Sequence, residues 1–432
     1  MNKRLVTASA ACLLMMLSGC MPKNADNATS TSGQGQGQEK PPEPVTLKLY
    51  DTQQFNEADF AKLISEPLKK KYPYITVEKI DKSKGNTLNN VIATNQQFDL
   101  FTIWQGEIPS QEQLAFFEDM TPLFTKNKFD LNRFDQDSLQ AVKAVSAGGL
   151  FGLPYNVQFN ALFYNKDIFD KFGVAYPKDG MTWEETIELA KKVTRLDNGT
   201  QYRGLDPEGY TRLSFPLSLN ILEPGSNKIH VNSEPYKRVF ELGKTINDIP
   251  GNQQKGSVWE GFFKNRTTAM LAMYNIFSTP DFIKAEGLNW DVAQYPSYSD
   301  LPNKYGMYDL HLIGISKTSK YKDAALKVME VLLSDEVQTA SVRSTGRLSP
   351  LKDPKFKEAY GADMPLLKGK HIQSIFKSSS AKGTTYSKHY LEARKLVDAE
   401  YKNFLAGKND VNTALRTAEE KISQYVAQQD KK

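Results

Sequence analysis

Cysteine is scarce in this chain, with two residues, Cys12 and Cys20, among 432. Both lie in the first twenty residues, so the remainder can form no internal disulfide and must be stabilised by its hydrophobic core. Histidine is also rare and scattered without metal-ligand spacing, at His230, His311, His371 and His389. We therefore expect neither a zinc site nor a cofactor. The net charge of +5, from 55 basic and 50 acidic residues, argues against nucleic acid as a partner.

Long apolar runs are absent except at the N-terminus. Lys3 and Arg4 precede an apolar stretch over residues 5–17, which ends in Ser18-Gly19-Cys20. The stretch is shorter than the roughly 20 residues of a transmembrane helix, and it is typical of a cleaved lipoprotein signal. We predict that residues 1–19 are removed and that Cys20 carries acyl chains such as palmitate. The mature protein would then be anchored at the extracytoplasmic face of the cell membrane.

Residues 20–44 are rich in Asn, Ser, Thr, Gly and Gln, which predicts a flexible linker. The body alternates short apolar strands with amphipathic helices, the pattern of an α/β protein. We predict strands over 45–50, 75–80 and 98–103, and helices over 56–71, 88–95 and 111–124. Residues 150–164 form a long extended run that could lead from one domain into another.

Further along the chain, Thr182-Trp-Glu-Glu185 predicts a capping box at the start of a helix that ends near Arg195. Asp197-Asn198-Gly199 predicts a turn. Helices are also predicted over 316–334 and 391–428. Trp183 and Trp290 are interpreted as packing residues, since one opens a helix and the other a strand.

Several segments, in order, resemble the carbohydrate-binding group of extracellular solute-binding proteins of ABC importers, which includes maltose-binding protein. The first runs from Gly149-Leu-Phe-Gly-Leu-Pro-Tyr-Asn156 through Phe163-Tyr-Asn-Lys-Asp-Ile-Phe169 to the Thr-Trp helix start. The second contains Phe262 and the pair Ala269-Met270. The third runs from Trp290-Asp-Val-Ala-Gln-Tyr-Pro296 through Ile313-Gly-Ile-Ser-Lys-Thr-Ser319 to Thr345-Gly-Arg-Leu-Ser-Pro350. Together these segments cover nearly the whole mature body.

The resemblance implies a two-lobed, type II periplasmic-binding-protein-like fold, in which each lobe is a mixed sheet flanked by helices and the chain crosses the hinge three times. The first lobe would comprise 45–155 with 309–334, and the second 156–308 with 335–432. The ligand, a sugar or oligosaccharide, would lie in the cleft and favour the closed form. The partners would be ABC permease subunits with a separate ATPase, and the binding protein would be a monomer.

Sugars need aromatic plates and polar side chains, and ligands of open α/β sheets lie beyond the carboxyl ends of strands. The loops after the first and third strands therefore supply Asp51, Thr52, Gln53, Trp104, Gln105 and Glu107. The resemblance adds residues at the crossings and after the Ala-Met strand: Tyr155, Asn156, Tyr274, Asn275, Phe277, Tyr308, Asp309, His311 and Arg347. Trp104 is the preferred stacking residue, although a core ring is the alternative, and Glu107 stands nearer the position of the family's aromatic. His311 could equally be structural, and Arg347 could pair with an anionic group or lie at the surface.

The main alternative is a cell-envelope enzyme such as a lipid-anchored glycoside hydrolase, which needs two carboxylates about 5–10 Å apart. The adjacent pairs Glu184-Glu185 and Glu419-Glu420 lie on predicted helices, where neighbouring residues do not face each other. The sequence has no Gly-x-Ser-x-Gly elbow, His-Glu-x-x-His motif or phosphate loop. We therefore expect a binding protein rather than an enzyme. A binding protein for a non-sugar solute, or a purely structural lipoprotein, stays open.

Overall fold

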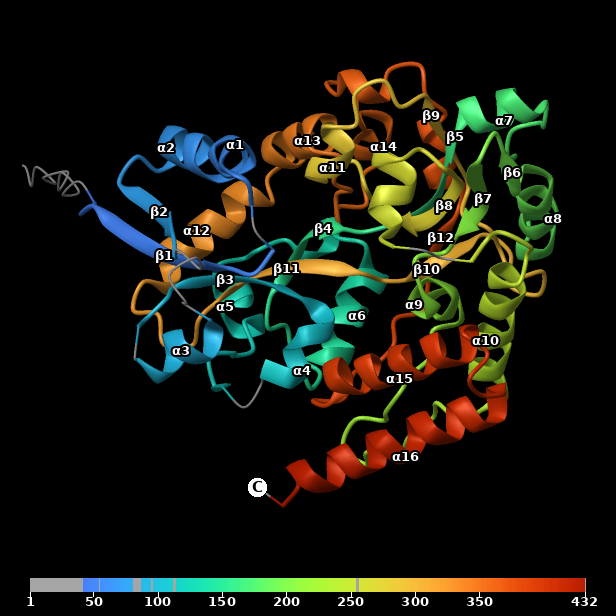
Figure 1. Cartoon of the computed structure of the whole chain (residues 1–432). Helices are drawn as coiled ribbons and strands as arrows, with labels where there is room; N and C mark the ends of the chain where they lie inside the picture. Colours follow the sequence, from blue (N-terminus) through green and yellow to red (C-terminus); the bar gives the residue numbers. More distant parts are fainter. Residues whose placement is uncertain are drawn as a thin grey trace, which may run out of the picture. The chain divides into compact units, whose positions relative to one another are not determined.

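The computed structural model describes residues 42–53, 55–80, 87–94, 96–111, 114–253 and 256–431. The chain divides after Pro42 into two units, and every helix and strand described below belongs to the second, Glu43–Lys432. This unit contains two five-stranded mixed sheets with helices packed against them (Figure 1). Cys20 and the predicted signal segment lie outside the described residues, so the lipid anchor stays a prediction.

The first sheet has the strand order β2-β1-β3-β11-β4. β1 runs parallel to β2 and β3, whereas β11 runs antiparallel to both β3 and β4. A strand from far along the chain therefore lies between two early ones. The strands are β1 (Val45–Asp51), β2 (Ile75–Lys79), β3 (Leu100–Trp104), β4 (Leu153–Val157) and β11 (Leu310–Ile315).

Helices and helical turns occupy most of the connections around this sheet. They are α1 (Glu57–Phe60), η1 (Ala61–Ser65), α2 (Glu66–Lys71), α3 (Leu88–Ala93), η3 (Gln105–Glu107), α4 (Ile108–Gln111), α5 (Thr121–Lys126), η5 (Leu131–Arg133), α6 (Gln136–Val145), α12 (Lys322–Leu332) and α13 (Asp335–Ser344). The helix predicted over 111–124 is wrong. Residues 115–120 have no regular structure, because Ala115 adopts a positive φ of 55° and Phe116 and Phe117 pack as buried loop rings against Phe101.

The second sheet has the order β6-β7-β8-β5-β9. β5 is antiparallel to β8 and β9, and β7 is parallel to β8. Its strands are β5 (Asn160–Asn165), β6 (Arg195–Asp197), β7 (Thr200–Asp206), β8 (Thr268–Tyr274) and β9 (Trp290–Ala293). A separate parallel pair joins β10 (Lys304–Met307) to β12 (Ser379–Ala381).

The remaining helical elements follow the strands of the second sheet or the third passage of the chain. They are α7 (Lys166–Phe172), α8 (Trp183–Val193), α9 (Tyr210–Ser214), η6 (Phe215–Leu217), α10 (Glu234–Asn247), η7 (Glu260–Lys264), α11 (Pro280–Ile283), α14 (Lys355–Glu358), η8 (Pro365–Leu367), η9 (Ile372–Lys377), α15 (Tyr390–Leu405) and α16 (Val411–Gln429). The predicted helical stretch over 391–428 is two helices, with Gly407 at a positive φ of 72° in the turn between them.

Several local predictions are confirmed. Thr182 and Glu185 form the capping box of α8, in which each side chain accepts a hydrogen bond from the other residue's backbone N–H. Asn198 and Gly199 both adopt positive φ in the turn between β6 and β7, as a two-residue hairpin requires. Trp183 is fully buried, so it serves packing. In the described part of the chain no helix is both long and apolar enough to cross a membrane.

The chain passes between the two sheets three times. Residues 157–160 join β4 to β5, and residues 307–310 join β10 to β11. The third passage, residues 345–352, follows α13 and runs beside the first, because Leu348 forms a bridge with Val157. These three segments, called the crossings below, place the ends of the two sheets next to each other.

Candidate ligand-binding site at the crossings

The carboxyl ends of strands from both sheets meet at the crossings. In the first sheet, β3 ends at Trp104, which is paired with His311 of β11. In the second, β7 ends at Asp206, and β8 ends at Tyr274 opposite Asn160. Since ligands of open α/β sheets lie beyond the carboxyl ends of their strands, this junction is the candidate site.

Trp104 links the first sheet to the second crossing. Its Nε1–H donates to Oδ1 of Asp309 at 2.8 Å, and its ring lies 5.6 Å from that of Tyr386 and 6.1 Å from that of Tyr390. Neither tyrosine was identified from the sequence. The neighbouring Gln105 is fully buried; its amide donates to the Tyr308 carbonyl, while its Oε1 has no hydrogen-bond partner among the described residues. The group thus combines aromatic faces with an unsatisfied acceptor.

Arg212 of α9, on the side of the second sheet, supplies a positive charge opposite in sign to the Asp309 carboxylate. Its Nε lies 2.8 Å from Oε2 of Glu208, and Nη1 donates to Oδ1 of Asn160 at 3.0 Å. The guanidinium carbon lies 5.2 Å from the centre of the Tyr274 ring, within reach of a cation–π contact. Glu208 and Arg212 were not predicted from the sequence, although Pro207-Glu208-Gly209 follows the carboxyl end of β7 directly.

The charges at this junction influence one another. Burial would lower the pKa of the Arg212 guanidinium, but the carboxylates of Glu208 and Asp309 raise it above its ordinary value. Burial raises the pKa of the Asp309 carboxyl, against the lowering effects of Arg212 and of the Trp104 N–H. Two carboxylates, Asp309 and Glu208, and two guanidiniums, Arg212 and Arg394, therefore interact at this junction, and the Trp104 N–H donates to Asp309.

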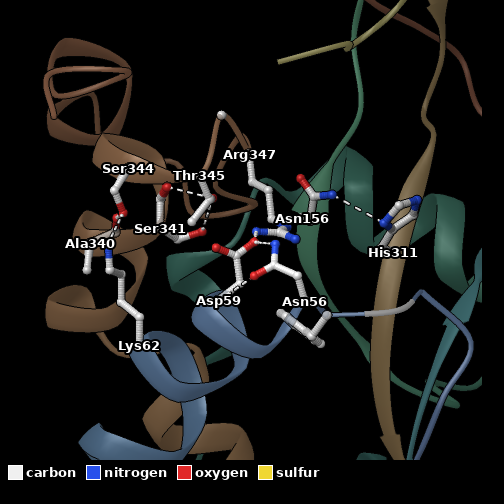
Figure 2. A network of polar contacts seen from close by, with 12 residues as sticks. Asn56, Asp59, Lys62, Asn156, His311, Ala340, Ser341, Ser344, Thr345 and Arg347 are labelled. Atoms are coloured by element: carbon white, nitrogen blue, oxygen red, sulfur yellow. Dashed lines mark hydrogen bonds and ion pairs between the residues drawn. The ribbon is translucent and has the colours of Figure 1, made fainter. Parts of the chain in front are cut away.

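A second polar group lies beside the first and third crossings (Figure 2). Nδ2 of Asn156 lies 3.2 Å from Nδ1 of His311, and Oδ1 of Asn156 has no partner among the described residues. Nη1 of Arg347 donates to Oδ2 of Asp59 at 2.5 Å, with both side chains mostly buried. Asn56 supports Asp59 from the N-terminus of α1. Arg347 is therefore paired within the protein.

Burial and the Arg347 guanidinium, in that order, lower the pKa of His311 to about 3. The imidazole is consequently neutral at physiological pH, and its Nδ1 can accept a hydrogen bond from the Asn156 amide. Tyr155, next to Asn156, stacks on Phe55 with ring centres 5.2 Å apart. Burial, and then the Asp51 carboxylate, raise the pKa of the Tyr155 phenol well above its ordinary value.

The loop after β1 is held mainly by its own hydrogen bonds. The carboxylate oxygens of Asp51 accept from the backbone N–H of Phe55 at 2.6 Å and from Oγ1 of Thr102 at 2.5 Å. Thr52 donates to the Thr102 carbonyl, and the Gln53 amide donates to Thr52. Thr52 and Gln53 are half-buried, so they can reach a ligand more readily than Asp51, which orders the loop.

The other predicted residues lie at different depths. Tyr308 lies at the second crossing and donates to Oδ2 of Asp135 at 2.6 Å. Asn275 is buried and donates to the Gly346 carbonyl at 2.7 Å, which ties β8 to the third crossing. Glu107 is half-buried in η3. Phe277 is fully buried; its ring lies 6.0 Å from that of Phe159 at the first crossing, and it packs against Gly346 of the third.

Comparison with known proteins places these features in a family. Residues 54–339 match the family described as bacterial extracellular solute-binding protein. The putative ABC transporter periplasmic-binding protein YcjN of Escherichia coli is 19% identical over 459 residues, which cover 99% of both chains. The sn-glycerol-3-phosphate-binding periplasmic protein UgpB of Brucella melitensis is 23% identical over 67% of this chain and 70% of its own.

Among solved structures, an ABC substrate-binding protein from Listeria monocytogenes in complex with cycloalternan is similar, with a TM-score of 0.71 and 20% identity. The alignment covers 89% of this chain and all of the other chain. That likeness confirms the type II two-sheet fold predicted above. With a family match over most of its described body, the chain belongs to the bacterial extracellular solute-binding proteins, the substrate-binding components of ABC transporters.

Proposed function

We propose that this protein captures a sugar or oligosaccharide at the junction of the two sheets and delivers it to an ABC permease. The observation that carries this proposal is the group Trp104, Asp309 and Arg212: Trp104 donates a hydrogen bond to Asp309, and the Asp309 and Arg212 charges interact across the two sheets. Sugars offer apolar faces and a rim of hydroxyls, so they need both kinds of partner. The Listeria protein solved with cycloalternan supports a carbohydrate ligand.

The unsatisfied acceptors support the same ligand class. Oε1 of Gln105, Oδ1 of Asn156 and Oε1 of Gln158 are buried and lack a hydrogen-bond partner among the described residues. A buried acceptor without a partner costs about 1–3 kcal/mol, and hydroxyl groups of a ligand can donate to it. Because Tyr386 and Tyr390 pack on Trp104, the ligand enters only when the two sheets separate, and it is enclosed when they close.

The proposed lobes keep the boundaries predicted from the sequence: residues 45–155 and 309–334 form the first lobe, and residues 156–308 and 335–432 form the second. Contacts of α13 with η1 and α12 favour moving the last boundary to about the third crossing. The protein would be a monomer anchored through acylated Cys20, with residues 20–44 as the linker. Its permease and ATPase would be separate chains.

Glycerol 3-phosphate is the second candidate ligand, because a relative carries that name. Arg212 is the buried cation at the junction that would meet a phosphate, yet it is already engaged by Glu208 and Asn160. A phosphate dianion placed beside Glu208 and Asp309 would meet repulsion from any ionised carboxylate. The charge balance thus favours a neutral ligand over an anionic one.

A thermal-shift screen of residues 43–432 tests the proposal. The panel holds mono- and oligosaccharides, glycerol 3-phosphate, peptides and polyamines. A ligand at 100 times its Kd stabilises the native state by about 2.7 kcal/mol, which raises the melting temperature. A response to sugars is expected. If no sugar raises the melting temperature but a compound of another class does, the ligand belongs to that other class. Hydrolysis of a panel sugar would instead support the alternative of a glycoside hydrolase.

Matched tryptophan variants then locate the site. Trp104→Ala removes the ring at the junction and should raise the Kd for the identified sugar roughly tenfold or more, since aromatic contacts are worth about 1 kcal/mol beyond the buried area. Trp290→Phe is the control, because Trp290 lies at the far end of β9 opposite Asn165. It should lower stability without changing the Kd. Equal affinity of Trp104→Ala and wild type would place the sugar elsewhere.

A further inference from the structure

A pocket of about 370 Å³ lies against the crossings but does not contain Trp104, Asp309 or Arg212. Its walls come from both halves of the unit: Asp135 at the start of α6, Phe356 of α14, and residues 378–380 around β12. The volume lies in the range of small-molecule sites, about 300–1,000 Å³. Of the residues predicted to bind the sugar, Tyr308 lines this pocket.

The pocket and the sugar site use neighbouring residues of the crossings. One residue from each crossing region lines the pocket: Val157, Tyr308 and Leu348. Their chain neighbours make the polar contacts of the sugar site: Asn156, Asp309 and Arg347. The crossings therefore form a wall shared by the two sites.

The lining offers donors for an anion. Ser378 accepts a hydrogen bond from the Gln294 amide, and Ser379 accepts one from the Lys304 ammonium, so each serine O–H is left to donate. Lys352 and Lys357 also line the pocket, and their ammonium groups have no ion pair or hydrogen bond within the described part of the chain.

Two of the charged side chains that line the pocket already have partners within the protein. The Asp135 carboxylate accepts the Tyr308 O–H, and the third lining lysine, Lys377, is paired with Asp179 at 2.6 Å. The two unpaired lysines outnumber the Asp135 carboxylate, which the Tyr308 hydrogen bond does not neutralise, so a ligand would meet a net positive charge. The apolar part of the lining includes Leu348 and Phe356, which suit a ring or short alkyl body.

We propose that this pocket is a second binding site, which takes a small molecule with an apolar body and one anionic group, a carboxylate or a phosphate monoester. The anionic group would accept hydrogen bonds from Ser378 and Ser379 and face the ammonium groups of Lys352 and Lys357. The body would lie against Leu348 and Phe356.

Occupancy of the pocket is coupled to sugar binding, and this part rests on the proposed function. All three crossings contribute to the pocket wall, so a rotation that opens or closes the sugar site changes the shape of the pocket. A ligand that fits one shape better shifts the equilibrium toward it, and the coupling acts equally in both directions.

Isothermal titration of the intact chain with benzoate, phenyl phosphate and benzyl alcohol tests the site. The first two share an anionic group on a ring and distinguish carboxylate from phosphate, while benzyl alcohol has the ring without charge. At least one anion should bind, and benzyl alcohol should bind about tenfold more weakly because it lacks the charge-assisted bonds. In the double variant Lys352→Gln/Lys357→Gln, the anion affinity should fall by about the same factor.

Lys355→Gln is the matched control, because Lys355 lies in α14 beside these residues but pairs with Asp335 and Asp353. It should bind the anion as wild type does. Absence of anion binding to the wild type, or equal binding by wild type and the double variant, overturns the site. Neither result depends on whether any sugar binds.

The coupling is measured with the sugar identified by the panel. A saturating concentration of the bound anion should change the sugar Kd by roughly fivefold or more, and the sugar should change the anion Kd by the same factor. If the sugar Kd is the same with and without the saturating anion, the proposed coupling is wrong, although the anion site itself is not contradicted.

Discussion

His311 should make this protein less stable in mild acid. Its imidazole lies 3.2 Å from the Asn156 amide and near the Arg347 guanidinium, and burial together with that cation lowers its pKa to about 3. In the unfolded chain the same imidazole has its ordinary pKa of 6.5. Between these values the unfolded chain binds a proton that the folded protein does not.

The sign and size of the effect follow from this difference. Because the folded-state pKa of His311 is lowered, its contribution is complete above the unfolded pKa and is lost as the pH falls from 6.5 toward about 3. At about pH 5 the pH lies about 1.5 units below the unfolded pKa of His311. Protonation therefore stabilises the unfolded state by about 2 kcal/mol more at about pH 5 than at about pH 7.5.

Urea denaturation of wild type and His311→Asn at these two pH values measures the effect. The asparagine Oδ1 can still accept from Asn156, but the side chain does not titrate. The wild type should lose about 2 kcal/mol more than the variant on acidification, since every other titrating group contributes equally to both proteins. Identical losses in the two proteins would show that His311 is not held neutral by its surroundings.

Three further predictions concern stability. Asp59→Asn and Arg347→Met, with the double variant, should give a coupling energy of about 1–2 kcal/mol in a denaturation cycle, because both side chains are mostly buried; additive effects would contradict a direct ion pair. Thr182→Ala should lower the free energy of unfolding by about 1 kcal/mol through loss of the α8 capping box, and Thr182→Ser should restore most of it. Gly243→Ala should cost about 1–3 kcal/mol, seen as a lower urea midpoint, because its Cβ would overlap the Tyr401 hydroxyl; an unchanged midpoint would mean that Tyr401 moves freely.

Local sequence patterns predicted most strands and helix starts of this fold. Alternating apolar residues identified β1 and β2, and the capping box identified α8, since these signals are short-range. The position of β11 between β3 and β4 has no local signal; the family resemblance assigned residues 309–334 to the first lobe but gave no strand order. Residues 111–124 were misassigned, because the apolar side chains of a buried loop mimic a helical face when Ala115 turns the chain.

The candidate site could be predicted only in part. The strand-end rule indicated Trp104, the family resemblance indicated Asp309 and Asn156, and all three lie at or beside the crossings. Tyr390 opens α15 and Tyr386 lies in the loop before it, and no local pattern there indicates contact with Trp104. Their role arises from tertiary packing, which a single sequence does not display.

The late position of β11 has a consequence for biogenesis. A nascent chain that has emerged only as far as β4 lacks the strand that joins β3 to β4, so its first sheet cannot close until residue 315 is available. Contacts of such high sequence separation delay folding. For a polypeptide threaded through a translocation pore in extended form, this delay is useful, because the N-terminal half cannot lock into a finished domain before passage.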